Sequence, residues 1–95
     1  MYAHIVSFQV KKGEEITFVE LQKFEEYTEA KPAGLDHFHI FKDLNDTSRY
    51  FLIEYWDSKS DKEKLANTDE YKHFQNVRNL AIEKKIDIID CEMVV

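Results

Sequence analysis

Two strand-like segments of this chain carry the side chains best suited to chemistry. The first, residues 35–42, reads LDHFHIFK and contains His37 and His39. A His-x-His spacing on a strand places both imidazoles on one side, about 7 Å apart. Imidazoles so placed could accept protons from a bound molecule, and with a third ligand they could chelate a metal. The pattern favours proton transfer over a metal site, and partly exposed structural histidines are the other interpretation.

The second segment, residues 49–56, reads RYFLIEYW and puts Glu54 and Trp56 on the same face of a strand. A carboxylate among apolar side chains needs a partner, so Glu54 could be an acid–base group or a hydrogen-bond acceptor in a pocket. It could also form a structural ion pair with Arg49 or Arg78. Trp56, at the strand end, could stack on a planar molecule or anchor the core.

Three further residues complete the predicted binding set. Tyr71 and Phe74 are three residues apart in a predicted helix, so their rings share one face. Phe74 is expected mainly in the core, while Tyr71 could place its hydroxyl in the pocket. Arg49 could hold an anion formed on the bound molecule. The predicted catalytic residues are therefore His37, His39 and Glu54, and the predicted binding residues are Trp56, Tyr71, Arg49 and Phe74.

Length and charge narrow the classes of function. Ninety-five residues make a single domain, residues 1–95, with a modest core. The formal net charge is −6 and the only arginines are Arg49 and Arg78, so no basic stripe exists for nucleic acid. The same acidity disfavours an anionic membrane, and no apolar run approaches the ~20 residues of a membrane helix. With no basic leader before the first strand, we expect a cytoplasmic protein.

The chain offers little to hold a cofactor. It has one cysteine, Cys91, whose apolar neighbours predict a buried and inert thiol. It has only 2 glycines, too few for the phosphate-binding loop of a nucleotide site. We therefore predict neither a metal nor an organic cofactor.

The apolar spacing predicts an alternation of strands and helices. In chain order the predicted elements are a strand at 2–10, a helix at 14–30, strands at 35–42 and 49–56, a polar helical turn at 57–64, a helix at 69–84 and a strand at 86–95. Ser58 and Thr68 are expected to cap the two later helical pieces, with Asp61 as an imperfect partner of Ser58. This β-α-β-β-α-β order predicts a ferredoxin-like α+β fold with a four-stranded antiparallel sheet.

The first strand is apolar on both faces. Val6, Phe8 and Val10 fall on one side, and Ala3 and Ile5 fall on the other. A sheet with one face in water would alternate more cleanly between apolar and polar side chains. We therefore expect the second face to be covered by another copy of the chain, in a two-fold homodimer.

The run Phe51–Lys59 (FLIEYWDSK), followed by Tyr71-Lys72-His73-Phe74, resembles the antibiotic-biosynthesis monooxygenase (ABM) domain of the dimeric α/β-barrel superfamily. Phe8-x-Val10-x-x-Gly13 before the first helix and Gly34 before the second strand also resemble it, so the resemblance spans essentially the whole chain. It implies a homodimer whose sheets close into a barrel, with a pocket between each sheet and its helices. Some members of the family oxidise quinols or polyaromatic compounds with dioxygen and no cofactor, and others degrade haem.

The chain departs from the family at three positions. Leu65 stands where the family often has a helical His and where the haem-degrading branch has Trp. Gln75 and Val6 replace the His and Asn of that branch. The resemblance therefore implies a cofactor-independent monooxygenase acting on a small planar aromatic or quinol-type compound, with His37 or His39 as proton acceptor. The alternatives are a non-catalytic small-molecule binding or stress-response module and, less favoured, a haem-binding or haem-degrading protein.

Overall fold

The computed structural model of the chain describes residues 1–27 and 32–95. Four strands and three helices follow one another in the order β1 (Tyr2–Val10), α1 (Glu15–Tyr27), β2 (Leu35–Lys42), β3 (Arg49–Trp56), α2 (Lys59–Ala66), α3 (Asp69–Asn79) and β4 (Ile82–Glu92). The strands form one antiparallel sheet in the order β2-β3-β1-β4. The predicted ferredoxin-like α+β fold is confirmed.

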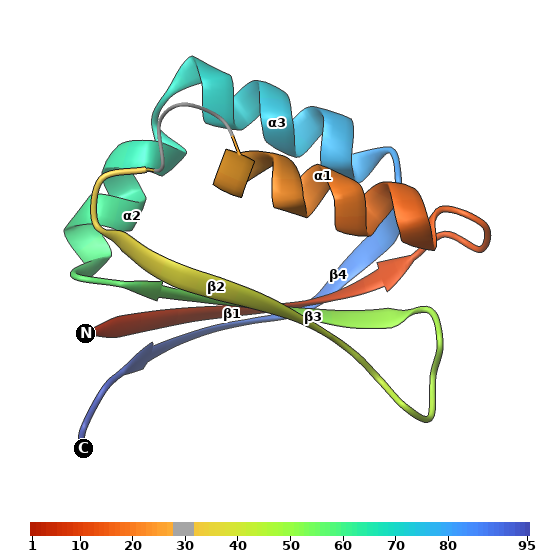
Figure 1. Cartoon of the computed structure of the whole chain (residues 1–95), viewed down its shortest axis with the longest axis horizontal. Helices are drawn as coiled ribbons and strands as arrows, with labels where there is room; N and C mark the ends of the chain where they lie inside the picture. The colour runs from red at the N-terminus through yellow and green to blue at the C-terminus, as the bar shows by residue number, and fades with distance from the viewer. Residues whose placement is uncertain (28–31) are drawn as a thin grey trace.

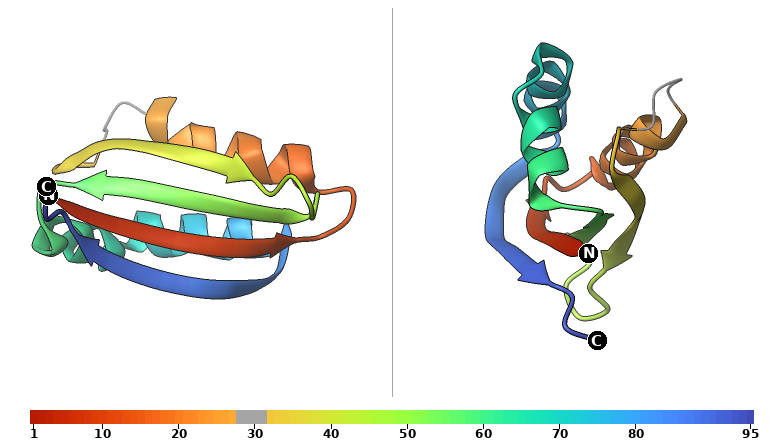
Figure 2. Two further views of the ribbon diagram at one scale, coloured as in Figure 1. Left: turned by 90° about the horizontal axis from the view of Figure 1, so that it is seen from below. Right: turned by 90° about the vertical axis from the view of Figure 1, so that its left-hand side faces the viewer.

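All of the helices lie on one face of the sheet, and the other face is open (Figures 1 and 2). In the view from below, α1 lies behind the β2 side of the sheet and α2 with α3 behind the β4 side (Figure 2). Alternation along β1 explains which side chains meet the helices, because Val6, Phe8 and Val10 are buried in one cluster with Phe18 of α1. The ring centroids of Phe8 and Phe18 are 5.1 Å apart.

A second, smaller core cluster lies at the other end of the sheet. Tyr2, Leu35 and Trp56 are buried together there, and Leu65 of α2 packs against them. The register explains the cluster, because Trp56 is the pairing partner of both Tyr2 and Leu35. This cluster fixes the last turn of α2 over the end of the sheet.

Side-chain caps start both of the later helices, as predicted. The Ser58 hydroxyl accepts a hydrogen bond from the backbone N–H of Asp61, and Thr68 accepts one from that of Tyr71. The Ser58 hydroxyl also donates to the Asp61 carboxylate at 2.9 Å, which completes a side-chain variant of the capping box. Gly34, with φ of +87°, lies so close that a Cβ there would be 2.5 Å from Asp61.

The boundary between the last helix and the last strand differs from the prediction. The helix ends at Asn79 rather than 84, and β4 begins at Ile82 rather than 86. Residues 81–85 favour a helix by their intrinsic propensities, but Ile82 pairs with Val10 and is buried in the main core. The apolar burial and the strand pairing outweigh the local preference. The first helix was predicted to run over 14–30, and its last predicted residues, 28–30, lie outside the described residues.

The prediction for Cys91 was wrong. Its thiol is exposed, on the edge strand β4. Edge-strand side chains after Ile82 are exposed throughout β4, including Ile88 at 58% and Ile89 at 49%. An apolar sequence around a residue therefore did not imply burial here, because the strand lies at the margin of the sheet. Of the described helices, none combines the length and apolar character needed to cross a membrane.

Candidate active site

A cavity of about 220 Å³ lies between the sheet and the helical pair α2–α3. Side chains of β1, β3 and β4 form its floor, and side chains of α2 and α3 form its walls. Polar and charged groups dominate the lining, whereas the main core cluster around Phe8, Val10 and Phe18 is largely apolar. The cavity is therefore the part of the fold where chemistry is best supported.

A histidine–carboxylate pair lies at the cavity floor. His4 on β1 and Asp90 on β4 are register partners, and His4 Nδ1 is 2.8 Å from Asp90 Oδ1. Because a carboxylate accepts hydrogen bonds, this contact assigns the ring proton to Nδ1. Nε2 has no hydrogen-bond partner among the described residues, so in the neutral ring it carries the free lone pair. A carboxylate that fixes the tautomer of an imidazole is the arrangement by which proteins make a general base.

Burial keeps this imidazole neutral. His4 is only 7% exposed. Loss of solvation lowers the pKa of His4 below its usual 6.5, Lys62 and Lys85 lower it further, and the hydrogen bond to Asp90 opposes them. At neutral pH the ring is therefore a base ready to accept a proton. The hydrogen bonds from Tyr2 and His4 hold the pKa of Asp90 below its usual range, so the carboxylate stays ionised.

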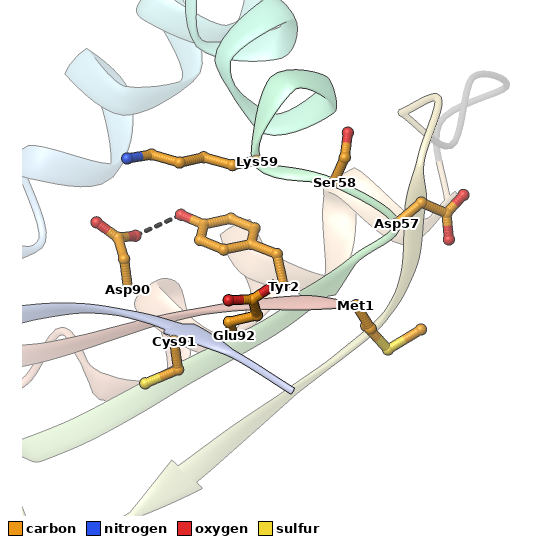
Figure 3. A pocket seen from close by; sticks show the side chains of 8 residues that line it. All are labelled: Met1, Tyr2, Asp57, Ser58, Lys59, Asp90, Cys91 and Glu92. Carbon is orange, nitrogen blue, oxygen red and sulfur yellow. Dashed lines mark hydrogen bonds between the residues drawn. The ribbon is translucent and has the colours of Figure 1, made fainter. Parts of the chain in front are cut away.

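Tyr2 connects the pair to a second hollow. Its hydroxyl donates a hydrogen bond to the same Asp90 oxygen, and burial together with that contact raises the pKa of Tyr2 above its usual 10.0. Figure 3 shows the Tyr2 ring beside the start of α2 with its hydroxyl directed at Asp90. Both residues line a surface cleft of about 430 Å³, whereas Cys91 points to the other side of the sheet (Figure 3). Asp90 borders both hollows, because it also lines the 220 Å³ cavity.

Glu54 is the second titratable group on the cavity floor. It is the register partner of His4 on β3 and is only 2% exposed. Burial raises the pKa of Glu54 above its usual 4.5, against the opposing effects of Lys62, the Trp56 indole and Arg78. The indole N–H acts on the carboxyl without a hydrogen bond of ordinary geometry, because Trp56 Nε1 is buried and unpartnered within the described residues. Glu54 forms no ion pair with either arginine in the part of the chain that the structure describes.

The cavity also contains three cationic side chains, Lys62, Arg78 and Lys85. Arg78 is 2% exposed, and its guanidinium lies over the rings of Phe8 at 5.0 Å and Phe74 at 5.8 Å. Such contacts stabilise a cation against an aromatic face. Burial and the two other cations lower the pKa of Lys85. The positive charges around Glu54 and His4 are suited to a negatively charged ligand.

The predicted histidines lie on the opposite face of the sheet. His37 and His39 pair with Tyr55 and Ile53, whose side chains alternate with the buried, helix-facing residues of β3. Both histidines are exposed, with ring centroids 5.4 Å apart, and His37 stacks on Tyr55 at 4.3 Å. The two imidazoles therefore lie on one side of β2, as predicted, but this side belongs to the open face of the sheet and not to the face covered by the helices.

Arg49 lies on this open face as well. It is 3.6 Å from Asp87 and covers the ring of Phe51 at 5.1 Å. It is not part of the cavity lining. A partly exposed ion pair of this length contributes little to stability, so its main structural effect is to cover the Phe51 ring.

The other predicted binding residues lie on the helix side. Trp56 is fully buried in the small core cluster and does not line the cavity. Tyr71 lines the cavity from α3, and Phe74, half-buried, has its ring 6.3 Å from that of Tyr71. Val6 and Gln75, two of the positions at which the chain departs from haem-degrading relatives, also line the cavity. The departures noted in the sequence therefore change the lining of the cavity itself.

His4 and Asp90 were not predicted from the sequence as residues of the site. Arg78 was considered only as a partner of Glu54, and its burial was not predicted. One sequence signal could have identified His4. It follows the alternation along β1 that buries Tyr2 and Val6, and so lies on the same face of the sheet as its pairing partner Glu54. Asp90 could be found only from the register of β4, whose start was predicted four residues late. Within the described residues, no cluster of three or more His, Cys, Asp or Glu side chains could hold a metal ion.

The sequence profile of the family described as antibiotic biosynthesis monooxygenase matches residues 1–77. The chain belongs to this family. The match to the antibiotic biosynthesis monooxygenase profile includes His4, Glu54, α2 and most of α3, and it ends before Arg78 and Asp90. No protein of curated function matches the sequence.

Solved structures share the fold at low sequence identity. A candidate antibiotic biosynthesis monooxygenase from Nitrosomonas europaea is 19% identical, with a TM-score of 0.83 and coverage of 100% of both chains. One from Bordetella bronchiseptica is 13% identical, with a TM-score of 0.85 and coverage of 99% of this chain and 97% of the other. One from Chloroflexus aurantiacus is 14% identical, with a TM-score of 0.82 and coverage of 99% and 93%. At these identities the similarity establishes only the fold, which is that of the antibiotic biosynthesis monooxygenase structures. The chemistry has to be inferred from the residues of the site.

Proposed function

We propose that this protein is a cofactor-independent monooxygenase that oxidises a small planar aromatic or quinol-type compound in the cavity beside α2 and α3. The observation that carries the proposal is the hydrogen bond between His4 and Asp90 at 2.8 Å, which leaves a neutral imidazole nitrogen free at the cavity floor. His4 therefore takes the role of proton acceptor that the sequence suggested for His37 or His39.

The chemistry relies on an acidic proton of the substrate. His4 Nε2 removes a phenolic or enolic proton, and the resulting imidazolium is stabilised by the ionised Asp90. The substrate anion transfers one electron to dioxygen, and the two radicals combine to a peroxide. The peroxide forms at a ring carbon that carries hydrogen, and loss of water then leaves one oxygen atom on that carbon, so a quinol becomes a hydroxyquinone and the other oxygen atom leaves as water. The substrate supplies all of the electrons.

Glu54 and Tyr71 support this reaction by their positions. Because burial raises the pKa of Glu54, a proton on this carboxyl could be donated to an oxygen of the bound anion or peroxide. Tyr71 offers an aromatic wall on the α3 side of the cavity. A cavity of about 150 Å³ accepts benzene in a well-studied engineered protein, so 220 Å³ suits a single substituted ring and not a haem.

Oxygen consumption tests the proposal. The wild-type protein is mixed with a panel of single-ring quinols, and dioxygen uptake is followed with an electrode. His4→Gln should lower kcat/KM about 10²–10⁴-fold, the usual contribution of a general base. His73→Gln, on the exposed side of α3, is the matched control and should leave the rate unchanged.

Two outcomes would contradict the proposal. Loss of activity in His37→Gln with activity retained in His4→Gln would move the base to the open face of the sheet. No uptake by the wild type over the whole panel, with ligands that raise Tm and are recovered unchanged, would favour a binding module over an enzyme.

We further propose that two copies of the chain pair through the open face of the sheet. This face exposes large apolar side chains, with Phe41 at 53% and Ile89 at 49%, which a partner sheet would cover. His37, His39 and Arg49 would then lie at the interface. Sedimentation equilibrium tests the pairing, because a particle with the 11.4 kDa mass of one chain would contradict it.

A further inference from the structure

The cavity has an excess of positive charge in a chain whose formal net charge is −6. Lys62, Arg78 and Lys85 line it together with the two carboxyl groups of Glu54 and Asp90. In the described parts of the chain, none of the three cations forms an ion pair with a carboxylate. The cavity therefore gathers three cations that are not matched one to one by carboxylates in direct contact with them.

Arg78 is the clearest case. Its side chain is 98% removed from solvent, since its exposure is 2%, and its Nε–H has no hydrogen-bond partner within the described residues. The guanidinium lies over the rings of Phe8 and Phe74, and rings accept no ordinary hydrogen bond, so the buried Nε–H is left free for a ligand. A buried cation without a paired anion is costly, so a negative group bound beside it would be strongly favoured.

The two carboxyl groups of the cavity do not fill this role. The Asp90 carboxylate already accepts hydrogen bonds from Tyr2 and His4. Glu54 is held by burial toward its neutral form, and it makes no ion pair with Arg78. The mutual repulsion of the cations is visible at Lys85, whose pKa is lowered by burial and then by Arg78 and Lys62. The field in the cavity thus favours an incoming anion.

We propose that the cavity binds its small molecule as a preformed anion, a single-ring compound bearing a carboxylate that Arg78 and Lys62 hold. This inference rests on the proposed function for the identity of the site, because the bound anion is the molecule whose acidic proton His4 removes. The volume of about 220 Å³ limits the ligand to one substituted ring. Planar carboxylates match the fork of N–H donors that an arginine presents.

Binding of benzoate tests the inference without any turnover. Isothermal titration of the wild-type protein with benzoate is compared with benzamide, which has the same shape without the charge. Benzoate should bind at least 10-fold more tightly, since a hydrogen bond to a charged group is worth about 1.5–3 kcal/mol. The affinity for benzoate should also fall as sodium chloride is added.

Variants and NMR place the anion in the cavity. Lys62→Gln should weaken benzoate binding 3- to 10-fold, while Lys59→Gln, on the same helix but outside the cavity lining, should not change it. Arg78→Met removes the buried cation, and Lys62→Gln remains informative if that variant fails to fold. In imidazole NMR spectra, benzoate should shift the His4 resonances and leave those of His37 unmoved.

The inference and the proposed function fail separately. Equal affinities for benzoate and benzamide, or shifts at His37 with none at His4, would overturn the anion site even if neutral quinols are oxidised. Tight, salt-sensitive benzoate binding without dioxygen uptake on any anionic or neutral ring compound would uphold the anion site and overturn the monooxygenase.

Discussion

Replacing Glu54 by Gln should stabilise the protein at neutral and alkaline pH. The side chain is 2% exposed and forms no ion pair within the described residues. Burial raises the pKa of Glu54, so the folded protein holds its proton more tightly than the unfolded chain. As the pH rises through this raised pKa, the folded state must bury a carboxylate and loses stability. Glutamine removes the charge and keeps the shape.

The size of the effect follows from the loss of solvation, which costs about 1–3 kcal/mol for a buried polar group and more for a full charge. Lys62 and Arg78 lower the pKa of Glu54 and so offset part of the cost. We therefore expect a gain of about 1–2 kcal/mol at pH 8. For a domain of this length, 1 kcal/mol corresponds to about 4–8 °C, so Tm should rise by about 4–16 °C.

Differential scanning calorimetry at pH 8 and pH 4 measures the effect and its sign. Below the unfolded-state pKa of 4.5, Glu54 is protonated in both states, so the gain should disappear at pH 4. Glu83→Gln, at an exposed position of β4, is the matched control and should change Tm by less than about 2 °C. An unchanged or lower Tm for Glu54→Gln at pH 8 would refute the conclusion that this carboxyl is buried at a cost.

Three further predictions concern the pH response and the local geometry. Because burial lowers the pKa of His4, its neutral form contributes stability above about pH 6.5 that is lost as the pH falls. In urea unfolding, the free energy of unfolding of His4→Gln should therefore decline less between pH 7 and 5 than that of the wild type. An equal decline in both proteins would contradict the assignment. Gly34→Ala should cost about 1–3 kcal/mol more than Gly13→Ala in urea unfolding, since both have positive φ but only at Gly34 would a Cβ meet Asp61; equal costs would show that this contact yields. Thr68→Ala should cost about 1 kcal/mol by loss of the α3 cap, and a change below 0.3 kcal/mol in the same assay would contradict the cap.

The fold followed from the sequence because its signals are local. The alternation along β1 and the short connection between β2 and β3 need only neighbouring residues, and both were predicted with the observed bounds. The start of β4 was not, because Ile82 looks helical until its pairing with Val10 is known. The pattern of residues around Ile82 cannot reveal a strand partner as distant in the chain as Val10.

The site was harder to predict for the same reason. His37 and His39 share a side, as expected, but the apolar residues Phe38 and Ile40 that alternate with them take the helix side and send the histidines to the other. The role proposed for His4 depends on its contact with Asp90, 86 positions away. Arg78 was weighed only as a partner of Glu54, whereas two aromatic rings cover its guanidinium and keep it buried.

The pairing of the first strand with the last has a consequence for how the protein is made. On the ribosome, His4 emerges 86 residues before its carboxylate partner Asp90, so the dyad forms only after all four strands of the sheet have been made. Contacts between residues so far apart in the sequence also slow folding, because the entropy of closing the long loop is lost before the contact stabilises the protein. A hydrogen bond from Met93 N to Met1 O joins the residue that precedes β1, which lines the cleft, to the residue that follows β4. Acquisition of the His4–Asp90 contact is thus a late event that reports complete assembly of the sheet.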